Sequence, residues 1–296
     1  MKELVVISGK GGTGKTSLTA AFALLAKQSV IADCDVDAAD LHLVLAPKVQ
    51  ECHDFFSGHE AVIRQEDCIK CGACLAHCRF DAIKMDGERA GEATFTIDPV
   101  ACEGCGVCIR FCPVQAIDFT EALCGEWMIS DTEYGPMAHV RLYVAAENSG
   151  KLVATVRREA KQLAEQAGHA LILVDGPPGI GCPVIASVTG ASLVLAVTEP
   201  TVSGEHDLKR VLELTRHFKI PTVVCVNKWD INEAMTERIE SLAQEAGAIP
   251  AGRIRYDVSV TKAQVAGKSV LHFSDSPAAQ DIHALWERLQ GILNST

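Results

Sequence analysis

The chain has 296 residues, of which 38 are acidic and 27 are basic, so its net charge is −11 at pH 7. An acidic chain without a basic cluster argues against nucleic acid as a partner, and no run approaches the ~18 apolar residues that a membrane span needs. Met1 and Lys2 lead directly into an apolar run without a signal peptide, so we expect a cytoplasmic protein.

A phosphate-binding loop follows the first predicted strand, Leu4–Ile7, and leads into a predicted helix that ends near Lys27. The loop has the pattern GxxxxGK[ST] at a strand–helix junction, where successive backbone N–H groups face a bound phosphate. Lys15 would neutralise the β- and γ-phosphates, and Thr16 would hold Mg²⁺ through its hydroxyl. The residues expected at the nucleotide are Gly9, Lys10, Gly11, Gly12, Thr13, Gly14, Lys15, Thr16 and Ser17.

A second buried strand is predicted at residues 30–33, and Asp35 follows it. Beyond this strand, a stretch with Cys52, His53, Asp54 and His59 shows no recognised spacing of metal ligands. We therefore predict a solvated loop in this stretch.

Eight of the thirteen cysteines fall into two runs with the spacing Cys-x₂-Cys-x₂-Cys-x₃-Cys. Disulfides fit poorly in a reducing cytoplasm, and zinc sites usually combine two separated Cys-x₂-Cys pairs. The spacing is instead that of bacterial two-cluster ferredoxins, in which a proline follows the last cysteine as Pro113 does here. We predict two 4Fe–4S clusters held by Cys68, Cys71, Cys74 and Cys78 together with Cys102, Cys105, Cys108 and Cys112.

The two runs form an internal repeat, in which residues 78–83 mirror residues 112–117. Such symmetry implies crossed ligation, with Cys112 completing the first cluster and Cys78 the second. Arg79 stands where a proline is expected, which makes the turn after Cys78 less certain but removes no ligand. We expect a ferredoxin domain at 61–120, dependent on its clusters for folding, inserted into a P-loop domain formed by 1–60 and 121–296.

The rest of the chain alternates strands and helices. Two strands are predicted within 126–145, and an apolar strand at 171–174 ends in Asp175. Further strands are predicted at 193–197, at 222–226 and near Arg253, with helices at 153–166, 205–218, 233–246 and 279–293. This order indicates an α/β fold with a doubly wound, mostly parallel sheet. Asp35 and Asp175 would then lie beside the phosphate loop and serve Mg²⁺ and the attacking water.

The sequence Asn227-Lys228-Trp229-Asp230 follows the strand at 222–226. It matches the guanine-reading Asn-Lys-x-Asp of GTPases, so this motif alone leaves ATP and GTP open. The last helix has the pattern of a helix that packs on the sheet, and we expect no membrane attachment.

Lys10 gives the phosphate loop the form Lys-Gly-Gly-x-Gly-Lys-Thr. This form resembles the deviant Walker A loop of the MinD/ParA superfamily, which includes the nitrogenase iron protein and Mrp-type iron–sulfur carriers. The full chain resembles a MinD-type subgroup with an inserted ferredoxin domain. The resemblance implies a homodimer in which Lys10 reaches the partner's nucleotide. It also implies that Asp35 orients water, that Asp175 is the Walker B residue and that Asn227 contacts adenine, which favours ATP.

Cys182 follows Asp175 at the spacing of a cysteine that, in the nitrogenase iron protein, ligates a cluster shared across the dimer. The second cysteine of that pattern is missing here. A small residue before a helix-starting proline is therefore the plainer interpretation.

The sequence as a whole predicts a dimeric ATPase that couples nucleotide state to electron transfer toward an unidentified redox partner. Two alternatives stay open. The protein could deliver iron–sulfur or metal centres to a client, or it could be a positioning or scaffold ATPase that uses its clusters to sense redox state.

Overall fold

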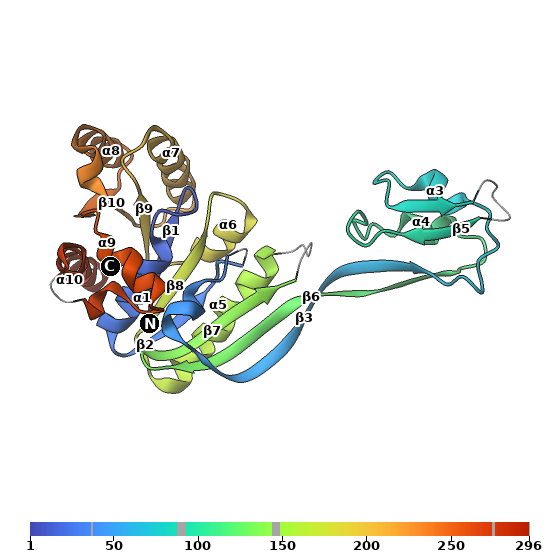
Figure 1. Ribbon diagram of the computed structural model, residues 1–296, viewed down its shortest axis with the longest axis horizontal. Coiled ribbons are helices and arrows are strands. Elements are labelled where there is room, and N and C mark those ends of the chain that lie inside the picture. The colour runs from blue at the N-terminus through green and yellow to red at the C-terminus, as the bar shows by residue number, and fades with distance from the viewer. Residues whose placement is uncertain (37, 88–92, 144–148, 274–275, 296) are drawn as a thin grey trace. The chain divides into compact units, whose positions relative to one another are not determined.

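The computed structural model describes residues 1–36, 38–87, 93–143, 149–273 and 276–295, and these divide into two compact units. The first unit contains residues 1–53 and 126–142 and the chain from Ser149 onward. The second unit contains Asp54–Gly125 and Tyr143. Figure 1 shows the elements of both units.

A nine-stranded sheet has the order β11-β10-β9-β1-β8-β2-β7-β6-β3 in the described chain. Neighbours from β11 to β7 pair in parallel. Its strands are β1 Lys2–Ser8, β2 Ser29–Asp33, β3 Lys48–Ile63, β6 Ile117–Thr132, β7 Gly135–Leu142, β8 Leu171–Pro178, β9 Leu193–Thr198, β10 Thr222–Asn227 and β11 Ile249–Ile254.

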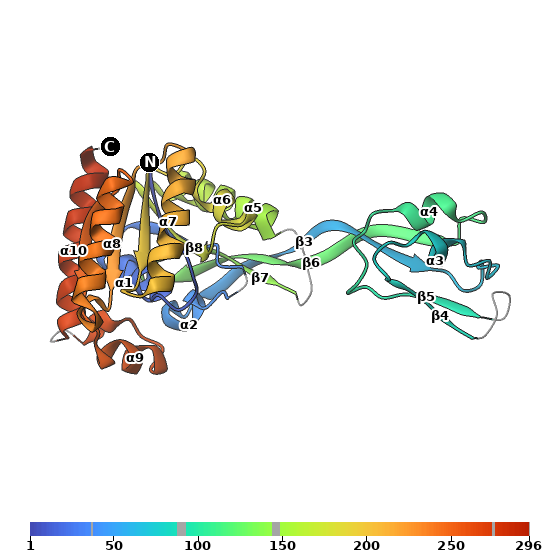
Figure 2. The same ribbon diagram turned by 90° about the horizontal axis from the view of Figure 1, so that it is seen from above.

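Helices cover the sheet of the first unit (Figure 2). They are α1 Lys15–Ala26, α2 Leu41–Leu45, α5 Ser149–Ala167, α6 Cys182–Val188, α7 Val202–His217, α8 Glu233–Glu245, α9 Val258–Val265 and α10 Pro277–Ser295. The core around α1 and α10 includes Leu4 and Val6, which alternate along β1. Ile7 lies near α6 instead, because a Cβ atom built at Gly176 would be 2.7 Å from Ile7 Cγ2 and 3.2 Å from Ser187 Oγ of α6. The α/β class and the mostly parallel sheet are therefore confirmed. No helix in the described ranges is both long and apolar enough to cross a bilayer.

The predicted loop around Cys52 is wrong, because these residues belong to β3. Their side chains are largely exposed, and the His53 ring stacks on Trp127 with ring centroids 4.1 Å apart. Its buried residues, Phe55, Ser57, Ala61 and Ile63, all lie in the second half of the strand and on one face. The strand is therefore polar over its first half, where hydrophobic patterning gives no signal.

The second unit contains the antiparallel pair β4 Ile83–Asp86 and β5 Thr94–Ile97, and the short helices α3 Ala73–His77 and α4 Val107–Phe111. The sequence repeat is also a repeat of backbone conformation. Left-handed φ angles recur in matched pairs, at Lys70 and Gly104, Gly72 and Gly106, and Asp81 and Gln115. The turn after Cys78 thus keeps the conformation of its counterpart although Arg79 replaces proline.

His139 of β7 is a buried imidazole whose Nε2 lies 2.7 Å from Ser130 Oγ. Burial, with a smaller effect of nearby His42, lowers the pKa of His139 from 6.5 to about 4. The unfolded chain therefore binds one more proton between these pH values, so the contribution of His139 to stability is present above pH 6.5 and is lost toward pH 4. We expect His139→Asn to flatten the fall of unfolding free energy in this window, by up to about 1.4 kcal/mol per pH unit. Urea unfolding of wild type and His139→Asn at several pH values measures this free energy. Parallel curves of unfolding free energy against pH would contradict the prediction.

Candidate functional site

The loop between β1 and α1 requires glycine at several positions. Gly12 and Gly14 have φ angles of 81° and 89°. A Cβ atom at Gly14 would lie 2.5 Å from Asn227 Nδ2, and one at Gly9 would lie 2.5 Å from Asp207 Cβ. A side chain at any of these glycines would strain or block the loop. Glycine is therefore needed for the backbone to curl closely around an anion at the start of α1.

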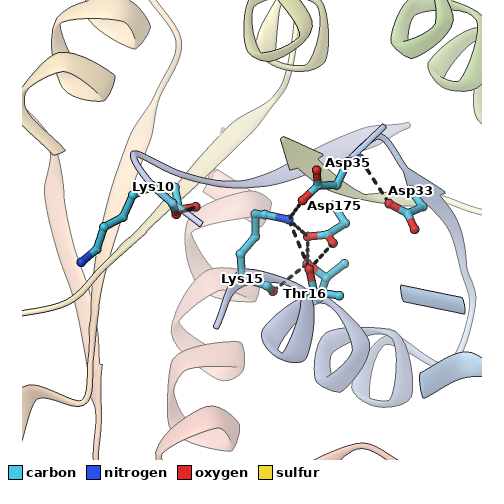
Figure 3. A network of polar contacts seen from close by, with 8 residues as sticks. Lys10, Lys15, Thr16, Asp33, Asp35 and Asp175 are labelled. Carbon is cyan, nitrogen blue, oxygen red and sulfur yellow. Dashed lines mark hydrogen bonds and ion pairs between the residues drawn. The ribbon is translucent and has the colours of Figure 1, made fainter. Parts of the chain in front are cut away.

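Lys15, the first residue of α1, extends between two acidic strand ends (Figure 3). Its Nζ lies 3.0 Å from Asp35 Oδ2 and 3.1 Å from Asp175 Oδ1. Thr16 donates to Asp175 Oδ2 at 2.7 Å, and Thr19 donates to Asp175 Oδ1 at 2.9 Å. The carboxyl ends of the neighbouring strands β8 and β2 thus bring the predicted acids to the phosphate loop.

Asp33 is an additional acid of this cluster that sequence reasoning missed. It is buried, and its Oδ1 accepts a hydrogen bond of 3.2 Å from the Asp35 backbone N–H. Burial and the charge of Asp175 raise the pKa of Asp33 well above its ordinary value. Burial also raises the pKa of Asp35, against the effect of Lys15. Although burial opposes the charge of Lys15, Asp175 and Asp35 raise its pKa.

The cluster is therefore short of positive charge, with one lysine among three acids. Asp33 Oδ2 and Asp35 Oδ1 are buried and have no hydrogen-bond partner among the described residues. Carboxylate and hydroxyl oxygens are the ligands that Mg²⁺ prefers, usually together with the phosphates of a nucleotide. The residues present fit such an ion, and Thr16 of the loop and Asp175, whose side-chain oxygens are 2.7 Å apart, would hold it together.

A pocket of about 380 Å³ opens in front of this cluster. Loop residues 11–17 line one side, and Asp35, Ala38 and Asp40 line another. Gln264 of α9 also lines it and donates to Ser17 Oγ at 2.8 Å. This volume is within the range of small-molecule sites.

Lys10 lies apart from the other predicted site residues and points away from them in Figure 3. Its Nζ is 3.4 Å from Glu199 Oε2 and 3.3 Å from Ser203 Oγ. Glu199 also binds Lys228, with 2.5 Å between Oε1 and Nζ. Glu199 belongs to no recognisable motif, so no sequence pattern predicts this contact.

The Asn227 side chain supports the phosphate loop through a hydrogen bond to the loop backbone. Its Nδ2 donates to the Thr13 carbonyl at 2.8 Å, and its Oδ1 accepts from the Lys228 N–H at 3.0 Å. Asp230 Oδ1 accepts from the Tyr256 N–H at 2.7 Å. Asn227 and Asp230 therefore hold neighbouring backbone groups, whereas the Lys228 side chain pairs with Glu199.

Two hollows in the second unit are each lined by four cysteines. Burial raises the pKa of Cys74, and the charges of Cys68 and Cys71 raise it further. Cys108 is affected in the same way by burial and by Cys102 and Cys105. The first hollow has Cys68, Cys71, Cys74 and Cys112, and the second has Cys78, Cys102, Cys105 and Cys108.

These sets have the same members as the crossed assignment from the repeat. Among the described residues, no three His, Cys, Asp or Glu side chains are grouped closely enough to hold one metal ion. The four thiolates of a 4Fe–4S cluster each bind a different iron, so they stand farther apart around a central space. Four cysteines surrounding a hollow fit that requirement.

Cys182 is the exposed first residue of α6, and Pro183 occupies the first turn of this helix. Its Cβ would lie 3.4 Å from a Cβ atom built at Gly150. Nothing in these contacts gives Cys182 a metal ligand as a neighbour.

Residues 4–270 match the family model described as the CobQ/CobB/MinD/ParA nucleotide binding domain. Uncharacterized protein MJ0578 of Methanocaldococcus jannaschii is 32% identical over 98% of this chain and 97% of its own length. Uncharacterized ATP-binding protein MJ0547 of the same organism is 21% identical over 97% and 87% of the two chains.

Solved structures share the fold at lower identity. The cell division ATPase MinD of Pyrococcus furiosus is 16% identical and has a TM-score of 0.60, covering 98% of this chain and 99% of its own. The septum site-determining protein MinD of Pyrococcus horikoshii, complexed with Mg-ADP, is 18% identical with a TM-score of 0.59, covering 99% and 98%.

Proposed function

Because the chain belongs to the CobQ/CobB/MinD/ParA family of nucleotide-binding proteins, we propose that it is a homodimeric, Mg²⁺-dependent ATPase. We further propose that its nucleotide state controls electron transfer through two 4Fe–4S clusters. The observation that carries the second part is the pair of hollows, each lined by three cysteines of one run and one cysteine of the other.

In the ATPase part, the loop amides and Lys15 bind the phosphates, and Thr16 and Asp175 hold Mg²⁺. Asp35 orients the attacking water. Lys15 pairs with both carboxylates, so a bound nucleotide must draw it from at least part of these ion pairs toward the phosphate oxygens. Asp35 loses a cation in that exchange, and the segment after β2 becomes free to rearrange. Nucleotide binding thereby changes the conformation of this segment.

ATP is proposed as the nucleotide, and GTP should compete poorly. A guanine base presents two N–H donors to an acidic reader, but Asp230 Oδ1 already accepts the Tyr256 N–H. Competition of unlabelled ATP and GTP against a fluorescent ATP analogue measures the preference, which we expect to be at least about tenfold. Equal displacement by GTP would contradict this interpretation of the motif.

In the second unit, each hollow offers four thiolates that would hold one cluster. When bound, the clusters supply one-electron oxidation and reduction. Phe95 and Phe119 line the hollows and exclude water from one side of each. Cys71 and Cys105 are exposed, so the chain leaves each site accessible to a redox partner.

Anaerobically purified protein should contain about eight irons and eight sulfides per chain, with absorbance near 400 nm that dithionite bleaches. Cys71→Ser should lose about half of the iron, because it removes a ligand of one cluster only. Cys52→Ser is the matched control, since Cys52 is also exposed but lines neither hollow. Zinc in place of iron, or equal iron loss in both variants, would contradict the cluster proposal.

Coupling to nucleotide is tested by the midpoint potentials with and without Mg-ATP. A shift supports nucleotide-controlled electron transfer, whereas unchanged potentials would favour a redox-sensing scaffold. One observation favours delivery of metal centres instead, namely the exposed position of Cys182 at the start of α6. Loss of cluster transfer to an apo-acceptor in Cys182→Ser, with an unchanged iron content, would support that second function.

A further inference from the structure

The first unit contains a second cavity of about 470 Å³, separate from the pocket at the phosphate loop. It lies between the segment that follows β2 and the strands β3, β6 and β7. Val36, Ala39 and His42 form one wall, and Val49, Met128 and His139 contribute to the others. All residues that line it belong to the first unit.

The two cavities share the segment after β2 as a common wall. Asp35, Ala38, Asp40, Leu43 and Val44 line the pocket at the phosphate loop. From the same segment, Val36, Ala39, His42 and Ala46 line the second cavity. The segment therefore presents one set of side chains to each cavity. A rearrangement of this segment that changes the shape of one cavity must therefore change the shape of the other cavity.

The lining of the second cavity has a distinct chemistry. Nitrogen-bearing side chains come from His42, His139 and Arg141, and no acidic side chain is among the described lining residues. Arg141 also donates to Glu126 Oε2, from Nε at 3.1 Å and from Nη2 at 2.5 Å, so part of its charge is neutralised by this ion pair outside the cavity. Most of the remaining lining is apolar, including Met128 and Leu142.

Two of these groups are held in place. His139 is fixed by its contact with Ser130, and His42 Nδ1 lies 2.5 Å from the Ala39 carbonyl. The His42 contact links the imidazole directly to the shared wall. A cavity with apolar walls and a few fixed polar groups is the usual form of a small-molecule site.

We propose that this cavity binds a small organic anion with an apolar body, and that its occupancy is linked to nucleotide binding through Asp35, Val36 and residues 38–46. The apolar walls take the body, and Arg141 and the second ring nitrogen of His139 meet the anionic group. The linkage rests on the ATPase part of the proposed function but not on the clusters. By reciprocity, an anion that favours one arrangement of the shared wall changes nucleotide affinity by the same factor by which nucleotide changes anion affinity.

The probe is 8-anilinonaphthalene-1-sulfonate, which combines an aromatic body with one anionic group and fluoresces in apolar sites. Val49→Glu puts a carboxylate at the cavity, and Val62→Glu is its matched control. Both valines lie on β3 and are 53% and 50% exposed, but Val62 lines neither cavity. We expect Val49→Glu to weaken probe binding by about tenfold or more, because like charges repel, and Val62→Glu to leave it unchanged. Equal binding by both variants would overturn the site.

The linkage is measured by calorimetric titration of Mg-ADP with and without saturating probe. We expect a saturable change of about fivefold or more in the Kd of Mg-ADP in wild type, and none in Val49→Glu. Simple competition at the phosphate loop would persist in that variant and would overturn the linkage, as would an unchanged Kd in wild type. Failure of Mg-ADP to bind at all would refute the nucleotide part of the proposed function and with it the linkage, whereas the probe comparison would still test the cavity.

Discussion

Lys15→Ala is expected to reduce affinity for Mg-ATP by on the order of 100-fold, since a charged partner of the phosphates is lost from a buried site. The structure adds a second reason. Lys15 is the cation that binds both Asp35 and Asp175, so its removal leaves uncompensated carboxylates facing the incoming phosphates. Calorimetric titration of the purified variant measures the affinity. Wild-type affinity in Lys15→Ala would contradict the assignment of the phosphate pocket.

Loss of binding must be separated from loss of folding. Burial already raises the pKa of Asp35, and removal of Lys15 should raise it further. A carboxyl group whose pKa is raised on folding contributes stability below its unfolded value, and this contribution is lost as pH rises through the folded value. The variant should therefore be more destabilised at neutral pH than near pH 4. Lys161→Ala, an exposed change on α5, is the control for both measurements.

The contacts of Lys15 follow from local sequence patterns. Asp35 and Asp175 each follow an apolar run, and the parallel neighbours β1, β8 and β2 end at one edge of the sheet. A residue just beyond such an edge must lie near the loop after β1. Asp33 gave a weaker signal, because an acid at the end of a strand usually faces solvent. Asp33 is buried because β2 pairs with β8, which places Asp33 opposite Asp175 in the sheet.

Other features depend on contacts that no local pattern specifies. The first half of β3 is polar and exposed, so its extended conformation comes from its place beside β6 in the sheet. The second cavity requires β3, β6 and β7 to meet the segment after β2. The division of the cysteines was easier to anticipate, because the repeat itself implies which cysteine is exchanged.

Lys10→Ala should leave nucleotide binding by the monomer largely intact but abolish hydrolysis and nucleotide-dependent dimerisation. The Lys10 side chain points away from Lys15 and the acids (Figure 3), and its Nζ contacts Glu199 and Ser203. It therefore does not line the phosphate pocket of its own chain, and it can reach the nucleotide of a second chain once it leaves Glu199. Light scattering with ATP and with a slowly hydrolysed analogue measures dimerisation, and phosphate release measures turnover. Unchanged dimerisation would remove the proposed role of Lys10.

The contact with Glu199 makes the same prediction testable in the opposite direction. To reach a partner's phosphates, Lys10 must leave Glu199 Oε2, which is 3.4 Å from its Nζ. Glu199→Gln weakens this contact, so dimerisation should need less protein, by about two- to fivefold for a partly exposed ion pair. Glu205→Gln is the matched control, because Glu205 pairs with Arg238 and not with Lys10. Weaker dimerisation of Glu199→Gln than of both wild type and the control would contradict this prediction. Glu199 would then stabilise Lys10 in the dimer rather than oppose dimerisation by binding Lys10 in the monomer.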